Sequence, residues 1–289
     1  MIIRQLRDTS ADAEAVEAVS RAAFRDPTAP ADGPPDPDRR VRELARTAHA
    51  VRHDGPGCWI AERDGRALGV ALSLRREGLW LLSLFAVLPE AQGQGLGRLL
   101  LERAGTYGRG CLRGMLYASA SPAAARRYRR AGFTLHPAMR LSGTVDRAGL
   151  LDPGDIPVHP GNHTHLHLLD SVDRRARGSA HGVDHAFMLA HYDELLIADA
   201  LAGSGYCYRS GGAVKLLAAT SKRIATRLLR EALARTPDGA EVAVEGLTAE
   251  QEWAVDVGME LGLSLSTGGY LAVRGMRPPA TYVPNPAFL

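Results

Sequence analysis

The spacing of hydrophobic and polar residues divides the first part of the chain into helices and a hairpin. Apolar residues recur with helical spacing from Ala11 to Phe24, and a second helix is predicted from about Asp38 to His49. The next segment, Cys58 to Leu74, has two β-rich arms around Asp64-Gly65. Because this pair favours the positive φ angles of a tight turn, the segment is predicted to form a β-hairpin.

A nearly continuous apolar run follows the hairpin. Leu79 to Val87 reads LWLLSLFAV, which is typical of a strand that is covered on both faces in the middle of a sheet. A glycine-rich loop and a leucine-striped helix come next. They are followed by a strand near residues 114–120, a helix from Pro122 to Ala131, and a strand after Gly132. This order predicts an α/β domain that ends near Arg140.

The second half of the chain repeats part of this order. Its predicted elements are a hairpin at 194–210, a buried strand at 213–220, a helix at 221–234, a strand at 241–247, a helix at 248–262 and closing strands at 263–275. Sliding the first half by 130 positions lays Ala124 on Ala254 and Gly132 on Gly262. The prolines between Leu141 and Pro160 indicate a linker. We therefore predict a first domain at 1–140, a linker at 141–160 and a second domain at 161–289.

Composition and charge narrow the class of protein. The chain has 289 residues, of which 45% are hydrophobic and 23% charged, close to the averages for soluble globular domains. A net charge of +3 is too small for a nucleic-acid-binding surface. No apolar run reaches the ~20 residues that cross a bilayer, and the three cysteines show no spacing typical of zinc sites or disulfides. We expect a cytoplasmic protein that binds neither nucleic acid nor membrane.

The glycine-rich loop carries the clearest chemical signal. Gly93, Gly95 and Gly97 lie in the five residues before a helix. The loop lacks the last glycine of a dinucleotide fingerprint, since Arg98 stands there, and it has no lysine for a P-loop. It matches a third pattern, Arg/Gln-x-x-Gly-x-Gly, in which backbone N–H groups and a helix N-terminus converge on a pyrophosphate.

A second motif strengthens this interpretation. In Ser121 to Phe133, the residues Ala124, Tyr128, Gly132 and Phe133 match the pattern Asn-x-x-Ala-x-x-x-Tyr-x-x-x-Gly-Phe, with Ser121 in place of the asparagine. With both motifs in this order, residues 1–140 resemble the GCN5-related N-acetyltransferase (GNAT) superfamily. The whole layout is similar to bacterial tandem GNAT proteins with a degenerate second domain. The resemblance implies two tandem α/β (α+β) domains, each a mixed, mostly antiparallel twisted sheet flanked by helices.

The resemblance also implies a reaction and a set of site residues. In the family, an acceptor amine attacks the thioester of acetyl-CoA directly in a ternary complex. Tyr128 would be the general acid that protonates the departing thiolate, and a backbone N–H near Val87 would stabilise the oxyanion. The implied acetyl-CoA-binding residues are Phe85, Ala86 and Val87 along the pantetheine, Gln92, Gly93, Gln94, Gly95, Leu96, Gly97 and Arg98 at the pyrophosphate, and Ser121.

The general base is not evident in the sequence. Many relatives carry a glutamate on the central strand, where this chain has Leu81, Leu82 and Ser83. Glu77 and His136 are candidates, although each is better explained as a surface or capping residue. Alternatively, ordered water carries the proton away, or the amine arrives neutral.

The second half lacks the acetyl-CoA signals, since it reads AATSKRIAT at the glycine loop and Gly258 at the position of Tyr128. We expect it to support the first domain or to wall off the acceptor pocket. Its alternating histidines, His163, His165 and His167, suggest a strand with one solvated face. Without a matching carboxylate pattern, and although His181, His185 and His191 follow, no metal is predicted.

The acceptor is left open. We expect a small-molecule primary amine, and a monomer or homodimer. The alternatives are a CoA-binding module without activity, an enzyme that acts on a protein amine, or one that uses a longer acyl-CoA. The proline-rich segment 25–39 is either a flexible connection or a lid, and its acidic residues would suit a cationic acceptor or only a solvated loop; they are Asp26, Asp32, Asp36 and Asp38.

Overall fold

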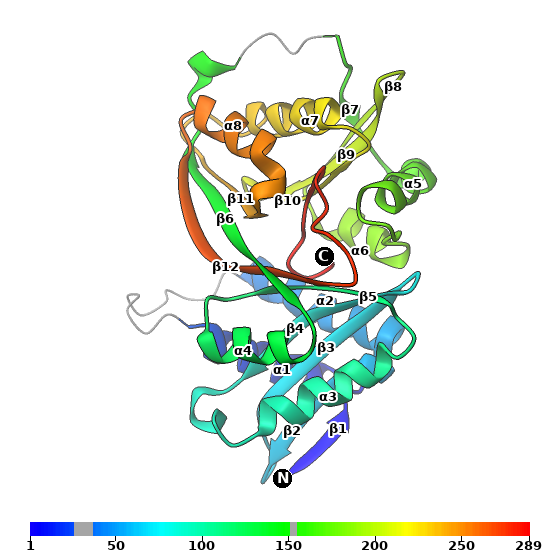
Figure 1. Cartoon of the computed structure of the whole chain (residues 1–289), viewed down its shortest axis with the longest axis vertical. Helices are drawn as coiled ribbons and strands as arrows, with labels where there is room; N and C mark the ends of the chain where they lie inside the picture. Colours follow the sequence, from blue (N-terminus) through cyan, green and yellow to red (C-terminus); the bar gives the residue numbers. More distant parts are fainter. Residues whose placement is uncertain (26–36, 151–154) are drawn as a thin grey trace. The chain divides into compact units, whose positions relative to one another are not determined.

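The computed structural model describes residues 1–25, 37–150 and 155–289, and contacts within it form two compact units, Met1–Cys111 and Leu112–Leu289. Figure 1 labels the helices and strands of both units. Asp26, Asp32 and Asp36 of the proline-rich segment lie outside the described residues. Among the helices that the structure describes, none combines the length and apolar character needed to cross a membrane.

Unit 1 is an antiparallel sheet with helices packed on it. Its strands follow the order β1-β2-β3-β4, and Asp64 (φ 52°) and Gly65 (φ 78°) form the predicted hairpin turn. The elements are β1 Ile2–Gln5, α1 Ser10–Phe24, α2 Pro37–Asp54, β2 Cys58–Arg63, β3 Arg66–Arg76, β4 Leu79–Val87 and α3 Leu96–Tyr107.

Close packing between α3 and the sheet depends on a glycine in β3. A Cβ atom added to Gly69 would lie 2.9 Å from Cδ1 of Leu100 and 3.1 Å from the carbonyl oxygen of Ala86. Leu100 is fully buried, as are Leu96 and Ala104 on the same side of α3. The leucine stripe of the sequence is thus the core face of α3, and it fixes the start of this helix against β3 and β4.

Unit 2 contains the remaining strands in the order β5-β12-β6-β11-β10-β9-β8-β7, with β13 paired to β10. Of the pairings described within this unit, β10–β11 is parallel and the others are antiparallel. The elements are β5 Arg113–Ala118, α4 Pro122–Arg130, β6 Thr134–Thr144, β7 His159–Pro160, α5 Leu166–Ala176, α6 Val183–His191, β8 Glu194–Ala200, β9 Gly203–Ser210, β10 Ala213–Ala219, α7 Lys222–Ala234, β11 Glu241–Leu247, α8 Glu252–Glu260, β12 Ser264–Arg274 and β13 Tyr282–Val283.

The internal repeat predicted from the sequence is present in the element order. The series β2, β3, β4, α3, β5, α4, β6 corresponds to β8, β9, β10, α7, β11, α8, β12. Gly132 (φ 85°) and Gly262 (φ 77°) each end the last helix of their series in the left-handed region. The chain therefore contains two copies of one supersecondary pattern.

The last strands of the two copies pair across the repeat. Strand β12 lies between β5 and β6, and β6 in turn pairs with β11. Residues 113–144 therefore contact the C-terminal half, and the contacts divide the chain after Cys111 and not near the boundary predicted at residue 140. The first residues of the predicted linker, Leu141–Thr144, continue β6.

Two local expectations in the second half differ from the structure. The segment expected as a strand with alternating histidines begins a helix instead: His163–His165 form a 3-10 turn that runs into α5. Asn162 caps this turn, its Oδ1 accepting the N–H of Thr164 at 2.9 Å. The closing strands form one strand, β12, whose register shifts at Gly268-Gly269.

Candidate functional site

The candidate acetyl-CoA site of unit 1 begins at an irregular strand. The β3–β4 register shifts so that Leu72 faces Leu84 and Ser73 faces Leu82, which leaves Ser83 as the extra residue of a β-bulge. Bulges re-aim the residues that follow them and are common beside active sites. Phe85, Ala86 and Val87, predicted to lie along the pantetheine, come directly after this bulge.

Two of the three loop glycines have backbone conformations that favour glycine. Gly93 (φ 77°) and Gly95 (φ 82°) lie in the left-handed region, and Gly95 is the N-cap of α3. A Cβ atom added to either would have no neighbour within 4 Å among the described residues, so these residues leave the space in front of them open. Gly97 is different, because it is buried in the first turn of α3.

The backbone N–H groups of the loop are available to a ligand. Hydrogen bonds of the described residues use the N–H groups of Gln92 and Arg98, which donate to Pro89 and Gly95. None uses the N–H groups of residues 93–97, which are Gly93, Gln94, Gly95, Leu96 and Gly97. These donors lie at the positive end of the α3 dipole, which is the arrangement that binds phosphate groups.

Side chains hold the loop in this shape. Gln92 Nε2 donates to the carbonyl oxygen of Val87 at 3.0 Å, which ties the loop to the end of β4. Gln94 Nε2 donates to the carbonyl oxygen of Glu90 at 3.0 Å, and its Oε1 accepts from Arg63 Nη2 at 3.4 Å. The two glutamines therefore brace the loop. Arg98, the first residue beyond the open donors, carries an exposed cationic side chain.

Tyr128 and Ser121 belong to unit 2, on α4. Tyr128 is 4% exposed, and burial raises the pKa of its phenol above the ordinary value of 10.0. The phenol is therefore a proton donor at neutral pH. Its ring makes an edge contact with Phe133, at 6.5 Å between centroids. Ser121 is the N-cap of α4, with Oγ accepting the N–H of Ala124 at 3.5 Å, so it has a structural role whether or not it binds CoA.

The two base candidates lie in different units. Glu77 lies in the β3–β4 turn, at the end of β4 opposite to the glycine loop. At ~3.3 Å per residue, the length of β4 places Glu77 roughly 25 Å or more from Val87, far from the backbone N–H that is expected to stabilise the oxyanion. His136 lies in unit 2, on β6, where it pairs with Leu271.

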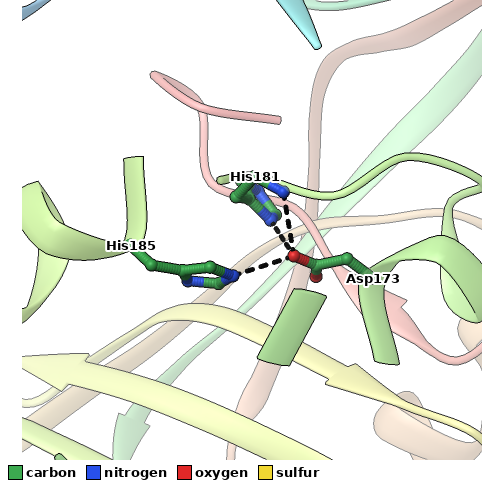
Figure 2. A group of neighbouring side chains, drawn as sticks. All are labelled: Asp173, His181 and His185. Atoms are coloured by element: carbon green, nitrogen blue, oxygen red, sulfur yellow. Dashed lines mark hydrogen bonds and ion pairs between the residues drawn. The ribbon is translucent and has the colours of Figure 1, made fainter. Parts of the chain in front are cut away.

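Unit 2 also contains a buried group that the sequence analysis did not single out. Asp173 on α5 meets His181, which precedes α6, and His185 on α6 (Figure 2). All three are fully buried. Burial raises the pKa of the Asp173 carboxyl, but the two histidines outweigh it and hold the pKa well below its usual range. Burial lowers the pKa of His181 to about 4. The sequence does carry a signal for this group: two aspartates three residues apart, Asp170 and Asp173, are followed by two histidines four residues apart, His181 and His185. The aspartates and the histidines were not considered together.

Comparisons with known proteins agree with these features. Residues 54–135 match the family model of the acetyltransferase (GNAT) domain. The fold is similar to that of a candidate acetyltransferase from Pyrococcus horikoshii, with a TM-score of 0.78 and 18% identity over 99% of this chain and 94% of that one. No curated protein matches the chain in sequence.

Two further structures have the same layout. A GCN5-related N-acetyltransferase from Sphaerobacter thermophilus has a TM-score of 0.57 and 16% identity over 94% of this chain and 95% of that one. A tandem GNAT protein from the clavulanic acid biosynthesis pathway has a TM-score of 0.59 and 13% identity over 96% of this chain and 99% of that one. The matched domain and the overall fold are both of the GNAT acetyltransferase type. Residues 54–135 thus match a GNAT domain in sequence, and the repeated fold of the chain is similar to that of a tandem GNAT protein.

Proposed function

We propose that the chain transfers the acetyl group of acetyl-CoA to a primary amine of a small molecule. The observation that carries the proposal is the row of open N–H groups at residues 93–97, held at the N-terminus of α3. A pyrophosphate supplies several acceptor oxygens and negative charge, which both the N–H groups and the helix dipole favour. The absence of side chains at Gly93 and Gly95 lets such a group approach the backbone.

The proposed reaction is a direct attack within a ternary complex. The amine nitrogen forms a bond to the thioester carbonyl carbon, and the carbonyl oxygen becomes an oxyanion. A backbone N–H near Val87 stabilises that charge. The C–S bond then breaks, and the departing thiolate takes a proton from Tyr128, whose burial keeps the phenol protonated.

The proton of the attacking amine takes a different route. Strand β4 reads LWLLSLFAV and carries neither a carboxylate nor an imidazole. Glu77 lies at the wrong end of this strand. We therefore propose that the amine arrives neutral or first loses a proton to water. After the attack, the nitrogen loses its remaining extra proton to water, and water returns a proton to the Tyr128 phenolate. In either case the rate should rise with pH until the acceptor amine itself is mostly deprotonated.

The proposal also names the class of acceptor and the cellular compartment of the reaction. A small cationic amine, in the cytoplasm, is our expectation, and acceptor groups on proteins are the competing class. The second copy of the fold has no glycine loop, so we propose that one chain binds one acetyl-CoA. The oligomeric state, monomer or homodimer, does not enter this argument.

Calorimetric titration of the whole chain with acetyl-CoA tests the proposal. One site per chain is expected. Two sites would contradict a degenerate second copy, and no binding would overturn the acetyltransferase proposal. Where one site is found, a panel of small amines, with CoA thiol release as the readout, separates an enzyme from a CoA-binding module: acetyl-CoA binding without turnover on any amine or peptide would favour the module.

A further inference from the structure

The buried group in unit 2 brings three metal-ligating atoms to one point. His181 Nδ1 lies 2.7 Å from Oδ2 of Asp173, and His185 Nε2 lies 2.9 Å from the same oxygen. The ligand atoms of the three residues all lie within 4.8 Å of one another. Figure 2 shows both rings pointing at this carboxylate from separate segments of the chain.

One carboxylate oxygen is unusually crowded. Besides the two imidazoles, Oδ2 of Asp173 also accepts the backbone N–H of His181, at 3.1 Å. A carboxylate offers about four lone-pair sites, or about two on each oxygen. Three N–H donors on one oxygen therefore exceed the number of sites that this oxygen offers. A cation between the imidazoles and the carboxylate would replace two of these hydrogen bonds by coordination.

The outer nitrogen of each ring already has a partner. His181 Nε2 lies 3.3 Å from the hydroxyl of Tyr282, and His185 Nδ1 lies 3.2 Å from the hydroxyl of Tyr208. A hydroxyl can donate or accept, so each ring can move its proton outward and present a bare nitrogen to a metal. Such outer-shell partners fix the tautomer and orientation of histidine ligands.

The carboxylates are held as well. The other oxygen of Asp173, Oδ1, accepts a hydrogen bond from Tyr206. A fourth donor lies beside the group, since Oδ1 of Asp170 is 3.6 Å from His185 Nε2. The Asp170 side chain is 24% exposed, whereas the other three are fully buried. Asp170, whose Oδ1 also accepts the N–H of Gly182 at 3.0 Å, is therefore the candidate fourth ligand and the solvent-exposed member of the group.

From these contacts we propose that Asp170, Asp173, His181 and His185 form a structural zinc site in unit 2. Two imidazoles at i and i+4 with carboxylate oxygens are a ligand set that Zn²⁺ accepts in tetrahedral geometry. With bonds of ~2.0–2.1 Å, tetrahedral ligand atoms lie about 3.3 Å apart. The separations of 2.7, 2.9 and 3.6 Å lie within about 0.6 Å of that value, and the ligand atoms of Asp173, His181 and His185 all lie within 4.8 Å of one another. The ion would tie α5 to α6.

Metal analysis of the full chain, purified without a histidine tag, tests the site. We expect one zinc per chain by plasma mass spectrometry after dialysis. Zinc added back to chelator-treated protein should raise the Tm, and Co²⁺ in its place should give visible absorption bands of tetrahedral intensity. Zinc at the buffer background, together with an unchanged Tm on adding zinc, would overturn the proposal in favour of a purely hydrogen-bonded group.

Three variants separate the site from general stability. His185→Gln should lose the metal. Because this change in the core can also impair folding, Asp170→Asn provides a second test at a partly exposed position and should weaken zinc affinity at least tenfold with an unchanged circular dichroism spectrum. The control is His163→Ala with His167→Ala, which removes two exposed histidines and should leave the zinc content unchanged. Equal zinc content in all variants would assign the metal to another place and reject the site.

Discussion

The N-termini of α3 and α7 occupy the same point in the two copies of the fold, yet they are built in opposite ways. Helix α3 begins after Gly95, which offers no side-chain cap, and the N–H groups of residues 93–97 stay open. Helix α7 begins after Ser221, whose Oγ accepts the N–H of Ile224 at 3.4 Å. One helix end is prepared for an external anion, and the other is satisfied by the protein.

The surroundings of the two helix ends differ in the same sense. Thr220 and Ser204 make two hydrogen bonds. The N–H of Thr220 donates to the carbonyl oxygen of Ser204, and Thr220 Oγ1 accepts the N–H of Ser204. A Cβ atom added to Gly203 would meet Thr220 Oγ1, so the β8–β9 turn covers the start of α7. No such cover exists in front of Gly93 and Gly95 among the described residues. The same topology therefore supports binding in one copy and packing in the other.

Replacing Gly95 by valine should give the largest effect. A β-branched residue is strained at φ 82°, so the loop must change shape and its N–H groups lose their common direction. Two lost hydrogen bonds to a charged phosphate, at roughly 1.5–3 kcal/mol each, correspond to at least a hundredfold weaker acetyl-CoA binding. Calorimetric titration measures the change in Kd.

Gly110→Val is the matched control for that variant. Gly110 has φ 86° and also has open space around an added Cβ atom, but it lies beyond the other end of α3. Both variants carry similar backbone strain, so both should lose stability. Only Gly95→Val should also lose acetyl-CoA binding. Equal weakening of acetyl-CoA binding in both would show that strain, and not the loop, explains the first result.

Tyr128→Phe should affect the chemical step and not the binding step. Removing a general acid typically costs a factor of ~10²–10⁴ in rate, so kcat should fall by about a hundredfold or more while the Kd for acetyl-CoA stays within a factor of about two. Steady-state kinetics with a responsive amine, together with calorimetry, measure both. An unchanged kcat would remove Tyr128 from the mechanism.

The pH profile gives a further test of the same residue. Burial raises the pKa of Tyr128 above 10.0, so the phenol keeps its proton as the pH rises through the neutral range. The proton-donating form is lost only above the raised value. The rate of the wild-type chain should therefore show no fall due to Tyr128 below about pH 10. A descending limb near neutral pH that disappears in the Tyr128→Phe variant would contradict this assignment.

Local patterns predicted much of the fold because they act over short distances. Strand β4 has the bounds expected from its apolar run, Leu79–Val87, and the hairpin turn lies at Asp64-Gly65. The glycine spacing also predicted the open loop at α3. These features depend on neighbours within a few residues, and side-chain periodicity and φ preference report such neighbours directly.

Long-range pairing was beyond the sequence pattern. Nothing local to β12 indicates that it lies between β5 and β6, since register there depends on partners more than a hundred residues away. Asp173 and the histidines His181 and His185 come together for a similar reason, because α5 and α6 must first fold back on each other. The alternating histidines near His163 led to the prediction of a strand. Instead, the cap at Asn162 starts a helical segment there.

Gln92→Ala should have a moderate effect on the open loop. It removes the hydrogen bond from Nε2 to the carbonyl oxygen of Val87, a contact worth about 1 kcal/mol or roughly a fivefold change in acetyl-CoA affinity. Thr106→Ala is the control, because Thr106 Oγ1 makes a similar bond to the carbonyl oxygen of Glu102 near the far end of α3. If the two variants bind acetyl-CoA equally well, Gln92 does not shape the site.

The smallest effect on binding is expected at the capped helix of the second copy. Ser221→Ala removes the N-cap of α7 and should lower the free energy of unfolding by about 1 kcal/mol, with acetyl-CoA affinity and stoichiometry unchanged. Ser121→Ala likewise removes a serine N-cap in the first copy, that of α4. Denaturant unfolding and calorimetry on both variants compare the two caps. A loss of affinity only in Ser121→Ala would give that serine the CoA-binding role expected from the family motif. A loss in Ser221→Ala would instead mean that the second copy contributes to binding, and the contrast between α3 and α7 would fail.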